Sequence, residues 1–445
     1  CHVVRRTDEI VRPKSDPFKY RFIELANGLR AILVHKPNNL RFHAKLYVDI
    51  GFVDDPKGVP GAAHLLEHVL YTGSLRYPEA GAYWKALNDN GCKGNGTTTL
   101  RKTYFAVKGP AAVLESMLDM FVDALVNPLF VRERIENEIT MVDNEFIDNS
   151  GSAPHILAAL EETLLHVNEQ QVGFGVGNAE SLRSHSDIES ILGSMHKDYY
   201  VAPNMTLFLL SGFDLNHLET VVADLFSALP ARPPVIDWDR RTALLTADRE
   251  RLGVLAHAAV FKGKTSMMIV WEVPNNGSLS EYWAAEYVMR MLSMPFKGFF
   301  VDMLKQFALA LDVSSLNIMR FSGCPVMRLR INIHLTSRGA TTPILVIDAL
   351  IQALKHLASV RPTEQYWNVL QDKEFVKMAN FDHLDDLGEH LPEHEPKRCI
   401  VDQFLPPQLH KGIVQSIREL LNIMANPDRM LAIVSTPRIL GSVIF

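Results

Sequence analysis

The stretch GAAHLLEHVLYTGSLRYPEAGAYW, residues 61–84, places three polar side chains inside an apolar run that is typical of a buried helix. His64 and His68 lie one helical turn apart, and Glu67 follows His64 by three residues, so all three share one side of the predicted helix. The remaining positions are mostly leucine, valine and alanine. The polar side is therefore expected to face a site within the protein rather than open water.

This spacing indicates a metal site. Two imidazoles at positions i and i+4 can present nitrogens to one tetrahedral cation, and neutral imidazole suits zinc. Glu67 then lies beside the metal, where it can take a proton from metal-activated water. The alternative is a chance pair of surface histidines, since H-x-x-E-H strings occur by chance in roughly a few per cent of such chains. The apolar neighbours favour the metal site.

A catalytic zinc needs a third protein ligand, and the run RERIENEITMVDNEFID, residues 132–148, can supply it. Its apolar residues form one helical stripe, with Glu138 and Glu145 along the edge, where both carboxylates are expected to be half-buried. The alternative for these two glutamates is a set of boundary salt bridges on an ordinary amphipathic helix. Without the histidine pair, that alternative would be preferred.

The second half of the chain repeats the pattern of the first. Two β-like runs precede the HLLEH helix, and two more, LGVLAHAAVF and SMMIVWEVP, precede a second apolar helix whose AAEYVMRML, from Ala284, matches AAHLLEHVL, from Ala62. We therefore predict two copies of one α+β unit, residues 1–230 and 231–445, joined by a linker at about 228–241. At the matching positions the second copy has Glu286, Met289 and Arg290, so only the first copy keeps the polar set.

Length and composition indicate a folded protein of several domains. The chain has 445 residues, of which 47% are hydrophobic and 22% charged, with a net charge of −6. This charge argues against nucleic acid or an anionic membrane as a main partner. The four cysteines are scattered without C-x-x-C pairing, which favours a reducing compartment such as the cytoplasm. Apolar runs fall short of the roughly 18 residues that a membrane span needs. Because the chain begins with Cys1, import into an organelle stays open.

The constellation resembles the pitrilysin and insulysin family of zinc metallopeptidases, which carry the inverted H-x-x-E-H signature and a glutamate ligand some seventy-odd residues later. Here Glu145 stands at that spacing after His68. The resemblance extends through four further stretches and thins in the second unit: YRFIELANGLRAIL at 20–33, GSLRYP at 73–78, FGVGN at 174–178 and NPDRMLAIVS at 426–435.

The resemblance implies a role for each site residue. His64, His68 and Glu145 would bind one Zn²⁺ per chain, and Glu67 would be the general base. Glu138 would orient a ligand from behind, as outer carboxylates do. The stretch GNGTTT at 94–99 is similar to the edge strand that binds peptide in the family, with Asn95 and Gly96 at its contact positions. An ordinary glycine turn is the alternative for this stretch.

The resemblance also implies a fold and an activity. The fold would be α+β, with two similar domains that each pack a mainly antiparallel sheet against helices, and the second domain would lack the zinc motif. The activity would be that of a zinc metalloendopeptidase acting on peptides or small unfolded polypeptides. Family members generally have twice this length, so we expect an N-terminal half that works with a C-terminal half or a second subunit. The alternative is a non-catalytic binding or scaffolding member.

A second histidine cluster lies near the C terminus, in HLDDLGEHLPEHEPKRC. His383, His390 and His394 alternate there with glutamates, which raises the question of an accessory metal site. Gly388 and Pro392 interrupt any regular helix, so a solvated loop is the preferred interpretation.

Overall fold

The computed structural model describes residues 2–12, 16–165, 175–247, 249–260, 263–320, 324–360, 362, 364, 366–368, 396–399 and 407–437. These residues form two compact units. The first takes in the described residues up to Phe146, those from 175 to Asp237, and 396–399. The second takes in 147–165, the described residues from Trp238 to 368, and 407–437. The cluster at His383, His390 and His394 lies outside the described residues.

The first unit is built on a sheet that has seven described strands in the order β1-β2-β3-β7-β4-β6-β5. Neighbouring strands are antiparallel except for β3 and β7, which are parallel. The strand bounds are β1 (Val3–Thr7), β2 (Lys19–Leu25), β3 (Arg30–His35), β4 (Arg41–Val48), β5 (Lys93–Thr98), β6 (Thr103–Pro110) and β7 (Met205–Ser211).

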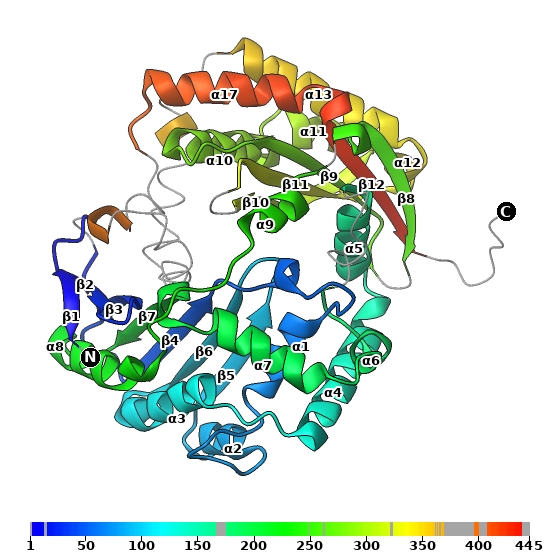
Figure 1. Cartoon of the computed structure of the whole chain (residues 1–445). Coiled ribbons are helices and arrows are strands. Elements are labelled where there is room, and N and C mark those ends of the chain that lie inside the picture. The colour runs from blue at the N-terminus through cyan, green and yellow to red at the C-terminus, as the bar shows by residue number, and fades with distance from the viewer. Residues whose placement is uncertain are drawn as a thin grey trace. The chain divides into compact units, whose positions relative to one another are not determined.

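Helices pack against this sheet. Figure 1 shows α1 and α7 lying across the part of the sheet formed by β4, β6 and β5. Their apolar faces and the sheet enclose a core that includes Leu46, Leu66 and Phe105. The helices are α1 (Ala62–Val69), α2 (Ala82–Asp89), α3 (Leu114–Val126), α4 (Arg132–Ser150), α6 (Ala179–Arg183), α7 (Ile188–Tyr199) and α8 (Leu215–Leu225).

The second unit has a sheet with five described strands in the order β10-β11-β9-β12-β8, in which β12 and β8 are parallel and the other neighbours antiparallel. The strands are β8 (Val254–Val260), β9 (Ser266–Pro274), β10 (Ala310–Arg320), β11 (Val326–Leu335) and β12 (Met430–Pro437). The helices are α5 (Ala153–Leu165), α9 (Trp238–Leu245), α10 (Leu279–Ser293), α11 (Phe300–Gln306), α12 (Ser337–Thr341), α13 (Pro343–Ser359) and α17 (Lys411–Met424).

The two sheets share one topology. Five strands of the first unit, β3-β7-β4-β6-β5, match β8-β12-β9-β11-β10 of the second in order, and the single parallel pair occupies the same place in both. In both units one helix, α1 or α10, begins the connection between the matching central strand and edge strand. This confirms the predicted α+β class with two similar units, each a mainly antiparallel sheet packed with helices.

Helix α5 belongs to the second unit, although the sequence-based division assigned its residues to the first domain. Leu157 and Leu165 pack against apolar residues of β9 and β12. Arg328 of β11 is 1% exposed and bonds Glu161 of α5 at 3.4 Å and Glu272 of β9 at 3.1 Å, and it also pairs with Glu162. These strands lie far from α5 in the sequence, so local patterns could not reveal the contacts. The predicted linker at 228–241 also ends differently, since α9 begins at Trp238.

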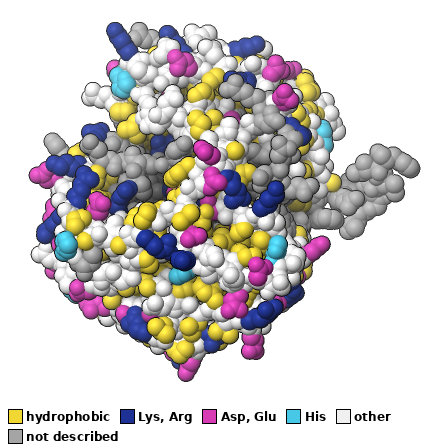
Figure 2. Space-filling model, in the orientation of Figure 1, with side chains coloured by type: hydrophobic (Ala, Val, Ile, Leu, Met, Phe, Trp, Pro, Cys, Tyr) yellow, Lys and Arg dark blue, Asp and Glu magenta, His cyan; other side chains and the backbone are white. Residues whose placement is uncertain are grey.

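The surface carries charges of both signs. Figure 2 shows basic and acidic side chains interspersed over the visible face. Among the described helices, none combines the length and the apolar character that a membrane crossing requires.

Candidate metal centre

Helix α1 is fixed at its N terminus by a buried carboxylate. Asp55 accepts hydrogen bonds from the backbone N–H of Gly61 at 2.7 Å and of Ala63 at 2.8 Å, which satisfies donors that a helix start leaves open. Gly61 has a φ of 91°, in the left-handed region that favours glycine. A Cβ there would lie 2.4 Å from the Cα of Gly177. The glycine therefore lets the segment 175–178 lie directly against the start of α1.

That segment orients His64. The Nδ1 of His64 donates a hydrogen bond to the carbonyl oxygen of Val176 at 2.8 Å. With its proton on Nδ1, the neutral ring presents the lone pair of Nε2. Burial, followed by the charge of the neighbouring His68, lowers the pKa of His64 and so favours this neutral form. Neutral imidazole is the form that binds metal ions.

His68 is oriented by a carboxylate instead. Its Nδ1 donates to the Oε2 of Glu138 at 3.1 Å, so in the neutral ring its Nε2 also presents a lone pair. The rings of His64 and His68 have centroids 4.8 Å apart and planes at 87°. Burial alone would lower the pKa of His68, but the hydrogen bond to Glu138 and the charges of Glu67, Glu138 and Glu145 outweigh it, and the pKa is raised.

Glu145 of α4 completes the group. Its Oε2 lies 3.6 Å from Nε2 of His64 and 3.8 Å from Nε2 of His68. Among the described residues, His64, His68 and Glu145 form the one group of three whose ligand atoms all lie close enough for a metal, within 4.8 Å of one another. A tetrahedral zinc with bonds of about 2.0–2.2 Å would place its ligand atoms about 3.3 Å apart. The donor set and its spacing therefore fit a zinc ion.

The two glutamates of α4 differ in burial. Glu138 is half-buried, as predicted, with 24% of its side chain exposed. Glu145 is 44% exposed, so the prediction of a half-buried carboxylate was wrong for this residue. The fully buried stripe of α4 ends at Val142, and Glu145 lies almost one turn beyond it. The candidate centre is consequently open on the side of Glu145.

Glu67 lies next to the group without joining it. The side chain is 6% exposed, and its Oε2 accepts a hydrogen bond from the Oγ1 of Thr98 at 2.8 Å. Burial raises the pKa of Glu67 to about 7, against the lowering effects of Thr98 and His68. A carboxylate with a pKa near neutrality, held beside a metal site, can exchange protons with water there.

Comparison with known families agrees with this geometry. The model described as insulinase (peptidase family M16) matches residues 30–170, and the model described as the peptidase M16 inactive domain matches residues 192–374. The chain belongs to the pitrilysin/insulysin family of peptidases. The matched ranges place the candidate centre in the first part of a peptidase M16 chain.

Relatives of this M16 chain have either about its length or more than twice its length. The A-factor-processing enzyme of Saccharomyces cerevisiae is 27% identical over 409 residues, which is 89% of this chain and 38% of that enzyme. The crystal structure of pitrilysin has a TM-score of 0.85 at 21% identity, covering 98% of this chain and 46% of that one. A peptidase M16 inactive domain from Pseudomonas fluorescens has a TM-score of 0.73 at 18% identity, covering 94% of this chain and 98% of that one. The chain thus spans less than half of the first two proteins.

The predicted peptide-binding residues of this family member lie on the edge of its first sheet. Asn95 and Gly96 belong to β5, the last strand in the sheet order, so the stretch is a strand and not the alternative glycine turn. Asn95 is exposed. A Cβ on Gly96 would lie 2.2 Å from the Oε1 of Glu67. The backbone of the edge strand therefore runs directly beside the side chain of Glu67.

Three contributors to the centre of this M16 chain were missed by sequence reasoning. They are the capping carboxylate of Asp55, the carbonyl of Val176 and the hydroxyl of Thr98. In the sequence, the FGVGN stretch at 174–178 carries only a family resemblance. Its closely packed glycines were the one available signal that its backbone approaches the HLLEH helix.

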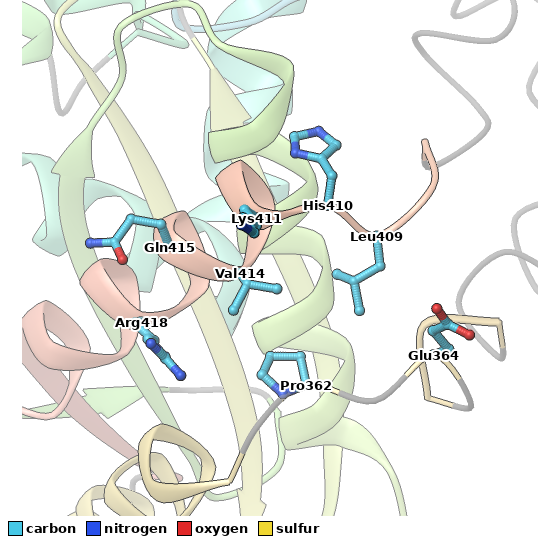
Figure 3. A pocket seen from close by; sticks show the side chains of 8 residues that line it. All are labelled: Pro362, Glu364, Leu409, His410, Lys411, Val414, Gln415 and Arg418. Atoms are coloured by element: carbon cyan, nitrogen blue, oxygen red, sulfur yellow. The ribbon is translucent and has the colours of Figure 1, made fainter.

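A separate cavity in the second unit lacks this chemistry. It has a volume of about 710 Å³ and is lined by Pro362, Glu364, Leu409, His410, Lys411, Val414, Gln415 and Arg418 (Figure 3). Figure 3 shows Glu364 and Arg418 on opposite sides of the cavity. The Nδ1 of His410 accepts a hydrogen bond from the backbone N–H of Gly412, so this ring caps α17. The cavity gathers no set of metal-binding side chains among the described residues.

Proposed function

We propose that this chain is the metal-binding half of a zinc metalloendopeptidase that hydrolyses peptides or small unfolded polypeptides. The observation that carries the proposal is the convergence of His64 and His68 with Glu145 from a distant helix, within 4.8 Å. The presence of Glu67 beside this group, and outside it, supports catalysis over a purely structural metal. A structural zinc site is normally closed by four protein ligands, whereas a catalytic site has three and an open position.

Each residue has a chemical role in this proposal. His64, His68 and Glu145 would hold the zinc, which supplies a Lewis acid that activates water and polarises the peptide carbonyl. Glu67 accepts the proton of the attacking water and then donates it to the leaving amine. Glu138 holds the ring of His68 through its Nδ1, as Val176 holds the ring of His64.

The substrate would bind as an extended strand. Edge strand β5 can take up a peptide by main-chain hydrogen bonds, with Asn95 and Gly96 in contact with it. Because Gly96 lies against Glu67, a peptide paired with this strand would pass close to the general base. Such main-chain recognition requires an unfolded segment and tolerates many side chains.

We further propose that turnover needs a second half. The chain spans 38% of the A-factor-processing enzyme and 46% of pitrilysin. The partner would be a C-terminal half of the same protein or a second subunit. It would cover the side of the centre on which Glu145 is exposed.

The direct test uses the full-length product of the reading frame, loaded with zinc, and an internally quenched fluorogenic peptide. We expect cleavage that a chelator abolishes and that stoichiometric zinc restores. Zinc binding without cleavage of any peptide in a diverse library would overturn the catalytic proposal.

A non-catalytic role is the second candidate. It is favoured by one observation, the match along 98% of a solved chain that is described as a peptidase M16 inactive domain. A non-catalytic member would bind peptides at β5 without consuming them. Retention of intact peptide by the zinc-loaded full-length protein would support this candidate, and its conversion to two fragments would exclude it.

A further inference from the structure

A chain of hydroxyl groups lies behind Glu67. The Oγ1 of Thr98 donates to the Oε2 of Glu67 at 2.8 Å, and it lies 3.1 Å from the Oγ1 of Thr103. The Oγ1 of Thr103 in turn donates to the carbonyl oxygen of Ile50 at 3.0 Å. Thr98 is 9% exposed and Thr103 is fully buried. The side chain of Glu67 is thereby connected to the backbone just after β4 through two strands of the sheet.

This chain fixes the direction of the Glu67 carboxylate. Oε2 is held by Thr98, and Oε1 lies over the backbone of Gly96, where a Cβ would stand only 2.2 Å away. Both contacts come from the same face of β5, because residues 96 and 98 alternate with 97 along the strand. Glu67 is thus held by the very strand that the proposed function assigns to the substrate.

The hydroxyl chain uses both of its donors. Thr98 donates to Glu67, and Thr103 donates to the carbonyl oxygen of Ile50, so each of the two buried hydroxyl groups has a hydrogen-bond acceptor.

We propose that Thr98 is a positioning residue for the general base, and that Thr103 sets the direction of its hydroxyl. The proposal rests on the proposed function, in which Glu67 is that base. The hydrogen bonds described for the Thr98 hydroxyl go to Glu67 and Thr103, and not to the candidate zinc ligands. Its effect is therefore expected on the rate of the chemical step rather than on zinc or substrate binding.

The first test compares Thr98→Val, Thr98→Ser and Thr72→Val in the zinc-loaded full-length protein. Thr98→Val keeps the shape and removes the donor, and we expect a 10- to 100-fold fall in kcat, with KM within about twofold and zinc content unchanged. Thr98→Ser should recover kcat to within about threefold. Thr72→Val is the matched control, since the buried hydroxyl of Thr72 donates to the carbonyl of Val69 at the end of α1, the helix that carries Glu67.

The outcomes of this test decide the role. An unchanged kcat in Thr98→Val, or a serine variant as impaired as the valine variant, would overturn the proposal. A rise in KM alone would also overturn it and would assign Thr98 to substrate binding instead. If Thr98→Val does not fold, Thr103→Val replaces it, and a smaller fall in kcat at unchanged zinc content is expected.

A second test does not depend on activity. In the metal-free protein at pH 8, Thr98→Val should lower the urea midpoint of unfolding, because it leaves Oε2 of a buried carboxylate without its donor. In the Glu67→Met background the same substitution should shift the midpoint much less, since no carboxylate remains. Equal shifts of the urea midpoint in both backgrounds would contradict a hydrogen bond between Thr98 and Glu67. If the parent protein cleaves no peptide, the proposed function fails. The comparison of Thr98→Val in the two backgrounds still determines whether Thr98 holds Glu67.

Discussion

Helix α1 of the first unit and helix α10 of the second occupy matching places in the same topology, yet only α1 carries the candidate metal-binding residues. Where α1 has His64 and His68, α10 has Glu286 and Arg290, whose Oε2 and Nε atoms lie 3.6 Å apart in an ordinary ion pair. Where α1 buries Glu67, α10 buries Met289. The fold therefore does not need polar residues at these positions, and their presence in α1 calls for another reason.

That reason is chemical, because the polar set is costly to the fold. A buried carboxylate is destabilising unless it is compensated, and Glu67 has the single hydroxyl of Thr98 as its side-chain donor among the described residues. A methionine such as Met289 fills the same volume without this cost. The difference between the helices separates what folding requires from what the site requires.

Replacing one glutamate in each of the two helices should give the largest contrast. Glu67→Gln is expected to lower kcat by roughly 100- to 10,000-fold, the range for loss of a general base, while zinc stays bound. Glu286→Gln in α10 should leave kcat unchanged. Both are measured with the zinc-loaded full-length protein and a fluorogenic peptide. A parent-like kcat in Glu67→Gln would remove Glu67 from the role of base.

The buried arginines of the two units offer a second contrast. Arg328 is 1% exposed and is surrounded by Glu161, Glu162 and Glu272. Arg328→Met removes the cation that Glu162 and Glu272 pair with, while Glu161 keeps its pair with Arg330, and we expect a loss of about 3–5 kcal/mol in the free energy of unfolding. Arg21→Met in the first unit should cost less, because its partners Asp8 and Glu219 are 48% and 19% exposed and so retain contact with water. Urea unfolding measures both, and equal losses would contradict the ranking.

The burial of Glu67 should make the stability of the metal-free protein depend on pH. Its pKa is raised from 4.5 to about 7, so the folded state holds the proton more tightly than the unfolded state. The stabilising contribution is complete below pH 4.5 and is lost as the pH rises through 7. At about 1.4 kcal/mol for each tenfold change in the acidity constant, the loss is roughly 3 kcal/mol.

The measurement compares the parent with Glu67→Gln, whose amide does not ionise. The variant should gain stability over the parent progressively between pH 5 and pH 8, and the gain should level off above that. Met289→Leu in the second unit serves as the control, and its difference in stability from the parent should be the same at every pH. A constant difference between the parent and Glu67→Gln at every pH would contradict the burial of an ionisable Glu67.

The smallest expected effect concerns the carboxylate behind His68. Glu138→Gln keeps an acceptor for the Nδ1 of His68 but removes its charge, and we expect zinc affinity to fall by about 10- to 100-fold. Glu136→Gln on the same helix, where the acid pairs with Arg183, should leave zinc affinity unchanged. Competition with a fluorescent zinc chelator measures both. Equal affinities in the two variants would show that Glu138 does not tune the ligand.

The sequence was informative wherever a local pattern decided the structure. The helical spacing of His64, Glu67 and His68 placed them together, and the repeat that matches Ala62 with Ala284 predicted the shared topology of β4, α1 and β9, α10. No local pattern predicted that Glu145 approaches the histidines. This approach depends on how α4 lies relative to α1, and only the family resemblance selected Glu145.

The features that the sequence did not predict depend on contacts between segments that lie far apart in the chain. Thr98 is one of three consecutive threonines, and nothing in the letters distinguishes the one that faces Glu67. The carbonyl of Val176 belongs to the backbone and leaves no signature in the side chain. The place of α5 in the second unit depends on Arg328, which lies on β11, far along the chain from α5.

The central claim is that α1 and α4 hold one zinc ion that the matching helix α10 cannot hold. The most direct measurement is the zinc content per chain after equilibration with a zinc buffer, for the parent, His68→Ala and Arg290→Ala. The account predicts one zinc per chain in the parent and in Arg290→Ala, and a clear loss in His68→Ala. The same zinc content in His68→Ala as in the parent would contradict it.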